Sequence, residues 1–116
     1  MEVSALDIVG LLHGLGISSK LKGFGYLVDI ISNILINDLD TFKMNEMYEL
    51  LSQKYGSSCV TITKCVRESI EKSWNNGDIE LIDKIFGYSL GYENRSPGNA
   101  LFVNSVVDYL KHVVKN

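Results

Sequence analysis

The chain has 116 residues, of which 46% are hydrophobic and 22% are charged, and its formal net charge is −3. This length and composition suit one globular domain, and they exclude a disordered chain and a chain with two separate cores. The longest apolar runs are too short to cross a bilayer and the first ten residues lack a basic segment, so we expect a cytoplasmic protein without membrane contact.

Apolar residues recur at intervals of three and four throughout the chain, which predicts an all-α fold. A first helix is expected over Ser4–Leu15 and should end at Gly16, because glycine readily adopts the left-handed conformation that closes a helix. Its buried stripe is predicted to be Leu6, Val9 and Leu12. A second helix is expected over about Ser19–Asn37, where Gly23 and Gly25 weaken the first turns and indicate a kink or a close contact.

A third helix is expected from about Met44 to Gly56, which supplies the turn. Ser57 or Ser58 then caps a fourth helix, the most regular in the chain, which ends at Gly77. The predicted buried face of this fourth helix is Ile62, Cys65, Val66, Ile70 and Trp74. Two helices joined by a short turn form either a helix-turn-helix or an αα-hairpin that binds nothing, and the spacing alone allows both.

Asp78 is expected to cap a short fifth helix whose apolar residues run from Ile79 to Phe86. A loop over Gly87–Gly98 follows, and a last helix is expected from Asn99 to about Val114. We therefore predict a single compact six-helix domain over residues 1–116, with a helix-turn-helix over about residues 43–75.

The outward face of the fourth helix is polar, as a helix that enters the major groove requires. Lysine and arginine can donate to guanine, threonine can contact a thymine methyl group or a phosphate, and backbone N–H groups at a helix start can hold a phosphate. The residues expected to approach base edges are Thr61, Thr63, Lys64 and Arg67. Those expected to approach the DNA backbone are Ser57, Ser58 and Lys72.

The same face also fits an ordinary solvated helix surface. Lys64 with Glu68, and Arg67 with Glu71, are spaced as i,i+4 ion pairs that could neutralise one another. In both pairs the cation comes first, which is the weaker order and is worth at most about 0.5 kcal/mol. DNA could therefore displace such pairs.

Other chemistry has little support in the sequence. Cys59 and Cys65 are six residues apart, about 9 Å along one helix, which is too far for a disulfide, so both should stay reduced. No further cysteine or histidine cluster accompanies them, so no metal is expected. His13 and His112 lie far apart without a nucleophile beside them, and the glycines lack the spacing of a phosphate loop. We expect no enzyme activity, cofactor or small-molecule substrate.

Several motifs point to a known family. They are LLHGLG at 11–16, KLKGFGYL at 20–27, ESIEKSWNNGDIE at 68–80, KIFGY at 84–88 and PGNALF at 97–102. In this order and spacing the chain resembles the DNA-binding effector domain of the stage-zero sporulation response regulator. The resemblance implies a six-helix domain whose third and fourth helices are a helix-turn-helix, binding to promoter DNA and contact with RNA polymerase.

The sequence departs from that family where DNA would be read. Where the family's recognition helix has arginine, valine, glutamate and arginine, this chain has the run Thr61 to Lys64, although Arg67 matches the next arginine. Glu68 replaces a histidine and places negative charge near the expected phosphates. The base preference should differ from that of the family, and the affinity should be lower.

The receiver domain that precedes this effector in the family is absent from these 116 residues. Met1 begins either a naturally short chain or a piece of a longer one; in a naturally short chain we expect no aspartyl-phosphate switch, and any homodimer should form through the effector domain or on DNA. The leading hypothesis is a sequence-specific transcription regulator that binds double-stranded promoter DNA. The alternative is a protein-interaction module with the same fold that has lost DNA binding and modulates a related regulator or RNA polymerase.

Overall fold

The computed structural model describes residues 3–39, 42–90 and 96–114. Over these ranges it contains helices and turns and no strand, which confirms the predicted all-α fold. The six α-helices are α1 (Ala5–Gly14), α2 (Lys22–Ile36), α3 (Met44–Tyr55), α4 (Cys59–Asn76), α5 (Ile79–Leu90) and α6 (Asn99–Tyr109). A π-helical segment, Leu110–Val114, continues α6. Across the described ranges, no helix combines the length and the hydropathy that a bilayer span needs.

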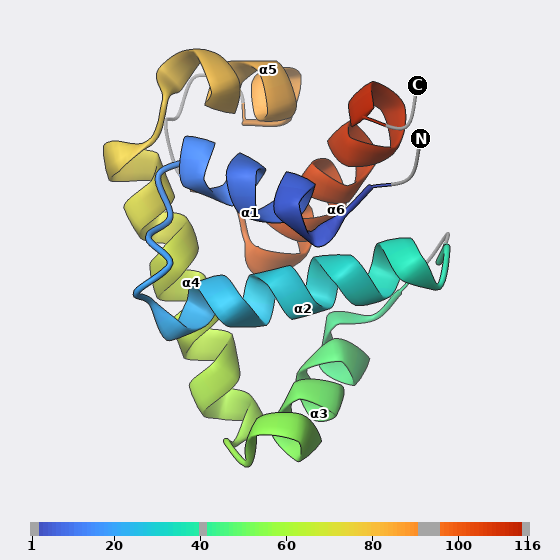
Figure 1. Cartoon of the computed structure of the whole chain (residues 1–116). Helices are drawn as coiled ribbons and strands as arrows, with labels where there is room; N and C mark the ends of the chain where they lie inside the picture. The colour runs from blue at the N-terminus through green and yellow to red at the C-terminus, as the bar shows by residue number, and fades with distance from the viewer. Residues whose placement is uncertain (1–2, 40–41, 91–95, 115–116) are drawn as a thin grey trace.

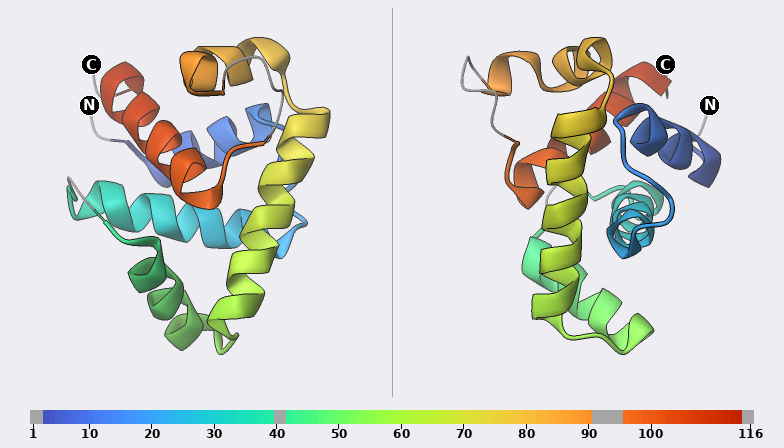
Figure 2. Two further views of the ribbon diagram at one scale, coloured as in Figure 1. Left: turned by 180° about the vertical axis from the view of Figure 1, so that it is seen from behind. Right: turned by 90° about the vertical axis from the view of Figure 1, so that its left-hand side faces the viewer.

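Helix α2 is the central element of the fold. It packs against α1, α3, α4 and α6. In Figure 1, α2 runs across the molecule with α1 and α6 on one side and α3 on the other, while the long α4 passes along one edge. The two views of Figure 2 show that α3 and α4 diverge from the turn that joins them and form one end of the molecule. The other end is formed by α5.

The core is apolar and continuous through all six helices. The largest fully buried side chains include Phe86 and Phe102, whose rings stack with centroids 5.4 Å apart. Trp74 at the end of α4 meets Phe86 edge-on at 5.0 Å. These three rings hold α5 and α6 against the far end of α4.

One residue of the buried stripe predicted for α1 is exposed. Leu6 is 81% exposed, and Ile8 and Leu12 are the residues of α1 that face the core. Apolar residues lie on nearly every side of α1, so their spacing does not single out one face. Ile79, in the first turn of α5, is also 81% exposed. The inward contacts of α5 are made by the buried Phe86 and by the partly buried Leu81, Ile82 and Ile85.

Two of the predicted helix bounds differ from those of the structure. The second helix begins at Lys22, three residues later than predicted from Ser19, because residues 18–21 form a turn. The fifth does not stop at Phe86: it kinks at Gly87, where the backbone leaves helical geometry, and continues to Leu90. The rest of the predicted loop includes residues 91–95, which lie outside the described ranges.

The turn after α1 is fixed against the end of α4. Gly16 has φ of +88°, the left-handed conformation predicted for it, and a Cβ there would lie 2.7 Å from the Cα atom of Gly77. The hydroxyl of the fully buried Ser73 donates to the carbonyl oxygen of Leu15 in this contact. Glycine is therefore needed at position 16 both for the backbone conformation and for the close approach.

Candidate nucleic-acid interface

The turn between α3 and α4 has the predicted length and chemistry. Gly56 ends α3 in the left-handed conformation, with φ of 71°, and its N–H donates to the carbonyl oxygen of Ser52. Of the two serines proposed as the next cap, Ser58 is the N-cap: its side chain accepts a hydrogen bond of 3.1 Å from the N–H of Thr61. Three residues, Gly56 to Ser58, therefore separate the two helices.

The inner face of α4 is largely as predicted. Ile62, Val66 and Ile70 are fully buried, while Cys65 and Trp74 are only partly buried. The sequence reasoning missed Ser69 and Ser73, which are almost completely buried. Each hydroxyl has a carbonyl acceptor, so these small residues let neighbouring backbone come close to α4 without leaving a polar group unsatisfied.

The outer face of α4 is exposed to solvent. Thr61, Lys64, Glu68 and Lys72 are all exposed. Within the part of the chain that the structure describes, Lys64 takes part in no ion pair, and the predicted pair with Glu68 is not formed. The Lys64 ammonium therefore keeps its donors for an external acceptor.

The two threonines of this region have hydroxyl groups engaged within α4. The Thr63 hydroxyl donates to the carbonyl oxygen of Cys59 at 2.7 Å. The Thr61 hydroxyl oxygen accepts from the hydroxyl of Ser58 at 2.9 Å. Thr61 is exposed on the outward face, whereas Thr63 is half-buried beside it.

Arg67 is bound within the molecule. Its Nε donates to Glu71 at 3.0 Å, which forms the predicted i,i+4 pair. Its two terminal nitrogens donate to the carbonyl oxygen of Pro97 and to the hydroxyl of Ser96, in the segment that leads into α6. A base edge could receive this guanidinium only after these hydrogen bonds break.

A hollow of about 580 Å³ lies beside the outward face, between α3, the start of α4 and the first residue of α6. Lys64 and Thr63 line it from α4, with Asn45 and Glu49 facing them from α3. Val60 also lines it and is 79% exposed. The sequence reasoning did not select Val60, although it precedes Lys64 by four residues and so shares its side of the helix.

Asn99 joins the three elements around this hollow. Its side-chain nitrogen donates to the hydroxyl of Tyr48 on α3 at 2.9 Å and to the carbonyl oxygen of Thr63 on α4 at 3.3 Å. The amide therefore fixes the separation of α3 and α4 at the place where both could meet a ligand. The side-chain oxygen of Asn99, Oδ1, is buried without a hydrogen-bond partner among the described residues.

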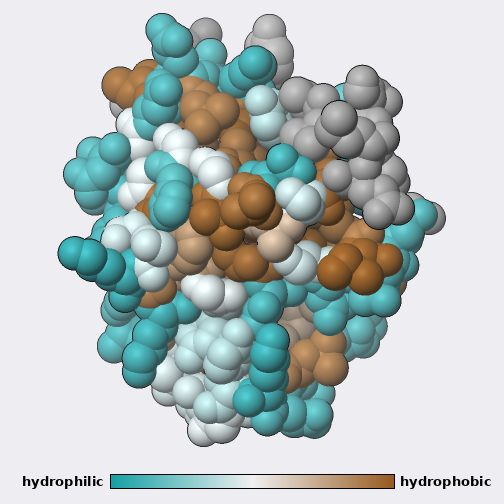
Figure 3. Space-filling view, in the orientation of Figure 1, coloured by the Kyte–Doolittle hydropathy of each residue, from teal (hydrophilic) through white to brown (hydrophobic). Residues whose placement is uncertain are grey.

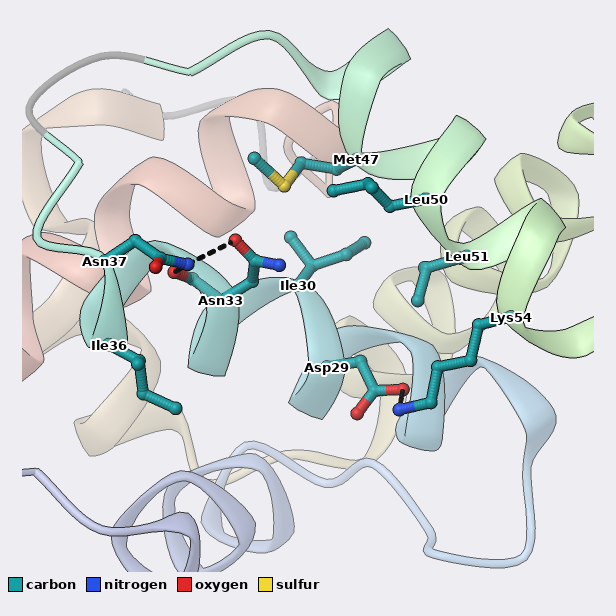
Figure 4. Close-up of a pocket in the computed structure, with 9 residues that line it drawn as sticks. All are labelled: Asp29, Ile30, Asn33, Ile36, Asn37, Met47, Leu50, Leu51 and Lys54. Atoms are coloured by element: carbon teal, nitrogen blue, oxygen red, sulfur yellow. Dashed lines mark hydrogen bonds and ion pairs between the residues drawn. The ribbon is translucent and has the colours of Figure 1, made fainter.

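Helix α3 is braced against α2 on its other side. Figure 4 shows the groove between them, with Leu50 and Leu51 of α3 facing Ile30 of α2 and with Lys54 paired to Asp29. The Lys54 Nζ lies 3.1 Å from the Asp29 carboxylate, and the Tyr55 hydroxyl also donates to that carboxylate.

The hydrogen bonds to Asp29 raise the pKa of Lys54 above its ordinary value, with the charge of the carboxylate as the next cause. The hydrogen bond to Asp29 also raises the pKa of Tyr55, followed by the partial burial of the phenol. Lys54 therefore stays protonated and Tyr55 stays neutral near neutral pH, and their contacts with Asp29 attach the last turn of α3 to α2.

The surface chemistry of this end of the molecule is polar but nearly neutral in charge. In Figure 3 hydrophobic residues gather near the middle of the visible face, and mostly polar or neutral residues cover the end where α3 meets α4. On α4 itself, Lys64 and Lys72 are accompanied by Glu68 and Glu71. A duplex would therefore meet a few separate cations and no broad basic patch.

No metal site accompanies this surface: the described residues hold no group of three or more His, Cys, Asp or Glu side chains that could bind an ion. Cys59 and Cys65 are both free thiols, as predicted from their spacing.

The chain matches one family over most of its length. A family model described as the C terminal of the sporulation initiation factor Spo0A matches residues 8–110. The matched range begins within α1 and extends to the end of α6, so it includes the whole of α3, the turn and α4.

Proposed function

Because the chain belongs to the Spo0A C-terminal family of DNA-binding sporulation regulators, we propose that it binds double-stranded promoter DNA sequence-specifically, with α4 inserted in the major groove. The observation that carries this proposal is the exposure of Lys64 and its neighbours on the outward face of α4, which the rest of the described chain leaves uncovered. A recognition helix needs such a face, since base edges are read by side chains that project away from the core.

The proposed contacts follow from the geometry of the first turns of α4. The Cys59 and Val60 N–H groups donate to no acceptor within the described residues, and they stand at a helix N-terminus, where a phosphate is favoured. Ser57 and Ser58 flank this position. Lys64 is placed to donate to guanine, Thr61 and Thr63 to contact a base edge, and Lys72 to contact the DNA backbone.

Arg67 receives a different role from the one that the sequence predicted. We place it as a positioning residue, since its guanidinium holds α4 to the segment before α6. Base reading would then depend on Lys64 as the principal cation. With one strong donor and a nearby Glu68, affinity should be modest and should rely on the local contacts more than on overall charge.

Two further partners follow from the same family. A second copy of the chain on adjacent half-sites and contact with RNA polymerase are proposals that rest on membership alone. A different function, a protein-interaction module without DNA affinity, is favoured by one observation: Val60 is an apolar side chain that is 79% exposed on the surface assigned to DNA.

The test is selection of bound oligonucleotides from a random-sequence duplex library, followed by anisotropy titration of the enriched site at several salt concentrations. We expect one enriched motif and an affinity that falls as salt rises. A chain that enriches no motif and shows no salt-dependent binding at low salt would exclude DNA as the ligand. Nuclease-resistant recovery of protein partners would then support the interaction module.

A further inference from the structure

The first turns of α4 carry four successive β-branched residues, Val60 to Thr63. Such residues are poor helix formers in exposed positions, because the preceding turn restricts their side chains. Ile62 is buried in the core and Thr63 is half-buried, whereas Val60 and Thr61 are exposed. Packing therefore does not explain Val60 and Thr61, which stand on the surface that the proposed function assigns to the duplex.

The side chains of Val60, Thr61 and Thr63 have little rotational freedom, and each of them carries at least one methyl group. The hydroxyl groups of Thr61 and Thr63 are each held by a hydrogen bond within α4, which limits rotation about their first side-chain bond. Val60 has two methyl groups and no polar atom, and it strongly prefers one rotamer in a helix. The start of α4 thus presents methyl groups in fixed positions, so contact with a ligand would cost little conformational entropy.

A methyl-bearing surface in the major groove has one natural counterpart among the bases. Thymine alone of the four standard bases carries a methyl group there, and apolar side chains recognise it by contact. Val60 and Lys64 line the same hollow and are one helical turn apart. The rise between them is about 6 Å, close to two base-pair steps of about 3.4 Å.

We propose that Val60 is a specificity-determining residue that packs against the C5 methyl group of a thymine, about two base pairs from the base that Lys64 contacts. This inference rests on the proposed function and deepens it. A hydrogen-bonding residue at position 60 would select through polar groups, whereas valine discriminates thymine from cytosine and from uracil through the methyl group alone.

The experiment uses the motif selected by the full chain. Each thymine of that motif is replaced in turn by deoxyuridine, which removes only the methyl group, and the dissociation constant is measured by anisotropy. For the wild-type chain we expect one thymine position at which the affinity falls about fourfold, the effect of losing one buried methyl group. The Val60→Ser variant should bind the unmodified motif less tightly and should lose the sensitivity to deoxyuridine at that position.

Leu6→Ser is the matched control, because Leu6 is equally exposed but lies on α1. This variant should keep both the affinity and the sensitivity to deoxyuridine. A wild-type chain that binds its motif equally well with deoxyuridine at every position would overturn the inference and leave the proposed function intact. A Val60→Ser variant that retains the wild-type sensitivity would overturn it too. A wild-type chain that selects no motif would overturn the proposed function itself, and the inference with it.

Discussion

Gly23 on α2 lies directly against the backbone of Cys65 on α4. A Cβ at position 23 would lie 2.3 Å from the Cys65 carbonyl oxygen and 2.0 Å from the Ser69 hydroxyl. Only a residue without a side chain allows the two helices this close. The contact holds α2 to the middle of α4, and it explains why a glycine is tolerated in the first turns of α2.

We therefore expect Gly23→Ala to destabilise the fold by about 3 kcal/mol, since the clash is with backbone that cannot yield without moving a helix. Gly25→Ala is the matched control: it lies in the same helix, and a Cβ there meets nothing within 4 Å. That substitution should stabilise the protein by about 0.5–1 kcal/mol, through the better helix propensity of alanine. Urea unfolding at neutral pH measures the stability of both variants. Similar midpoints for the two variants would contradict the close contact.

Arg67→Ala should lower stability by about 1–2 kcal/mol, because charged hydrogen bonds to Pro97 and Ser96 are lost. Glu71→Ala removes only the i,i+4 partner of the same arginine and should cost at most about 0.5 kcal/mol. Thermal unfolding of both variants provides the comparison. If Arg67→Ala leaves stability unchanged and abolishes DNA binding alone, Arg67 reads bases directly and the positioning role is wrong.

The sequence predicted the helices well where apolar spacing and helix ends agree. Gly56 and Ser58 have the backbone conformation and the capping bond that their residue types favour, so the turn and the start of α4 could be located. In α1, by contrast, apolar residues occupy most positions, and Leu6 was assigned to the core although it faces solvent. The buried Ser69 and Ser73 were missed because their neighbours come from distant parts of the chain.

The candidate site, too, could be predicted only where it depends on residues of a single helix. Helical periodicity locates the outward face of α4 and selects Lys64, since both depend only on residues within that helix. The hydrogen bonds of Arg67 join residues about thirty positions apart and end partly on a backbone carbonyl, which no side-chain pattern reveals. The spacing of Val60 from Lys64 also places it on the outward face, although valine has no polar group of the kind that selects the other candidate residues.

The cluster around Asp29 should make stability sensitive to alkaline pH. The pKa values of Lys54 and Tyr55 are both raised in the folded protein above their ordinary values of 10.5 and 10.0. The stability that Lys54 and Tyr55 contribute through Asp29 is therefore fully present below their ordinary pKa values. It is lost as the pH rises through their higher pKa values in the folded protein. We expect wild type to exceed Asp29→Asn in urea midpoint by a constant amount up to about pH 9.5 and by less above it. A difference that stays constant up to about pH 11.5 would contradict the assignment.

Lys64→Ala should separate DNA binding from folding. Lys64 is exposed and has no ion pair within the described residues, so its removal should change stability by less than about 0.5 kcal/mol. A lysine that donates to guanine contributes about 1–3 kcal/mol of discrimination, so we expect at least a fivefold loss of affinity for the selected motif and a relaxed preference at one position. If Lys64 instead contacts a phosphate, affinity should fall for all sequences and the salt slope should decrease by about one. Lys84→Ala, an exposed lysine on α5, is the control and should change neither quantity. Equal effects of the two substitutions would show that α4 is not the surface that meets DNA.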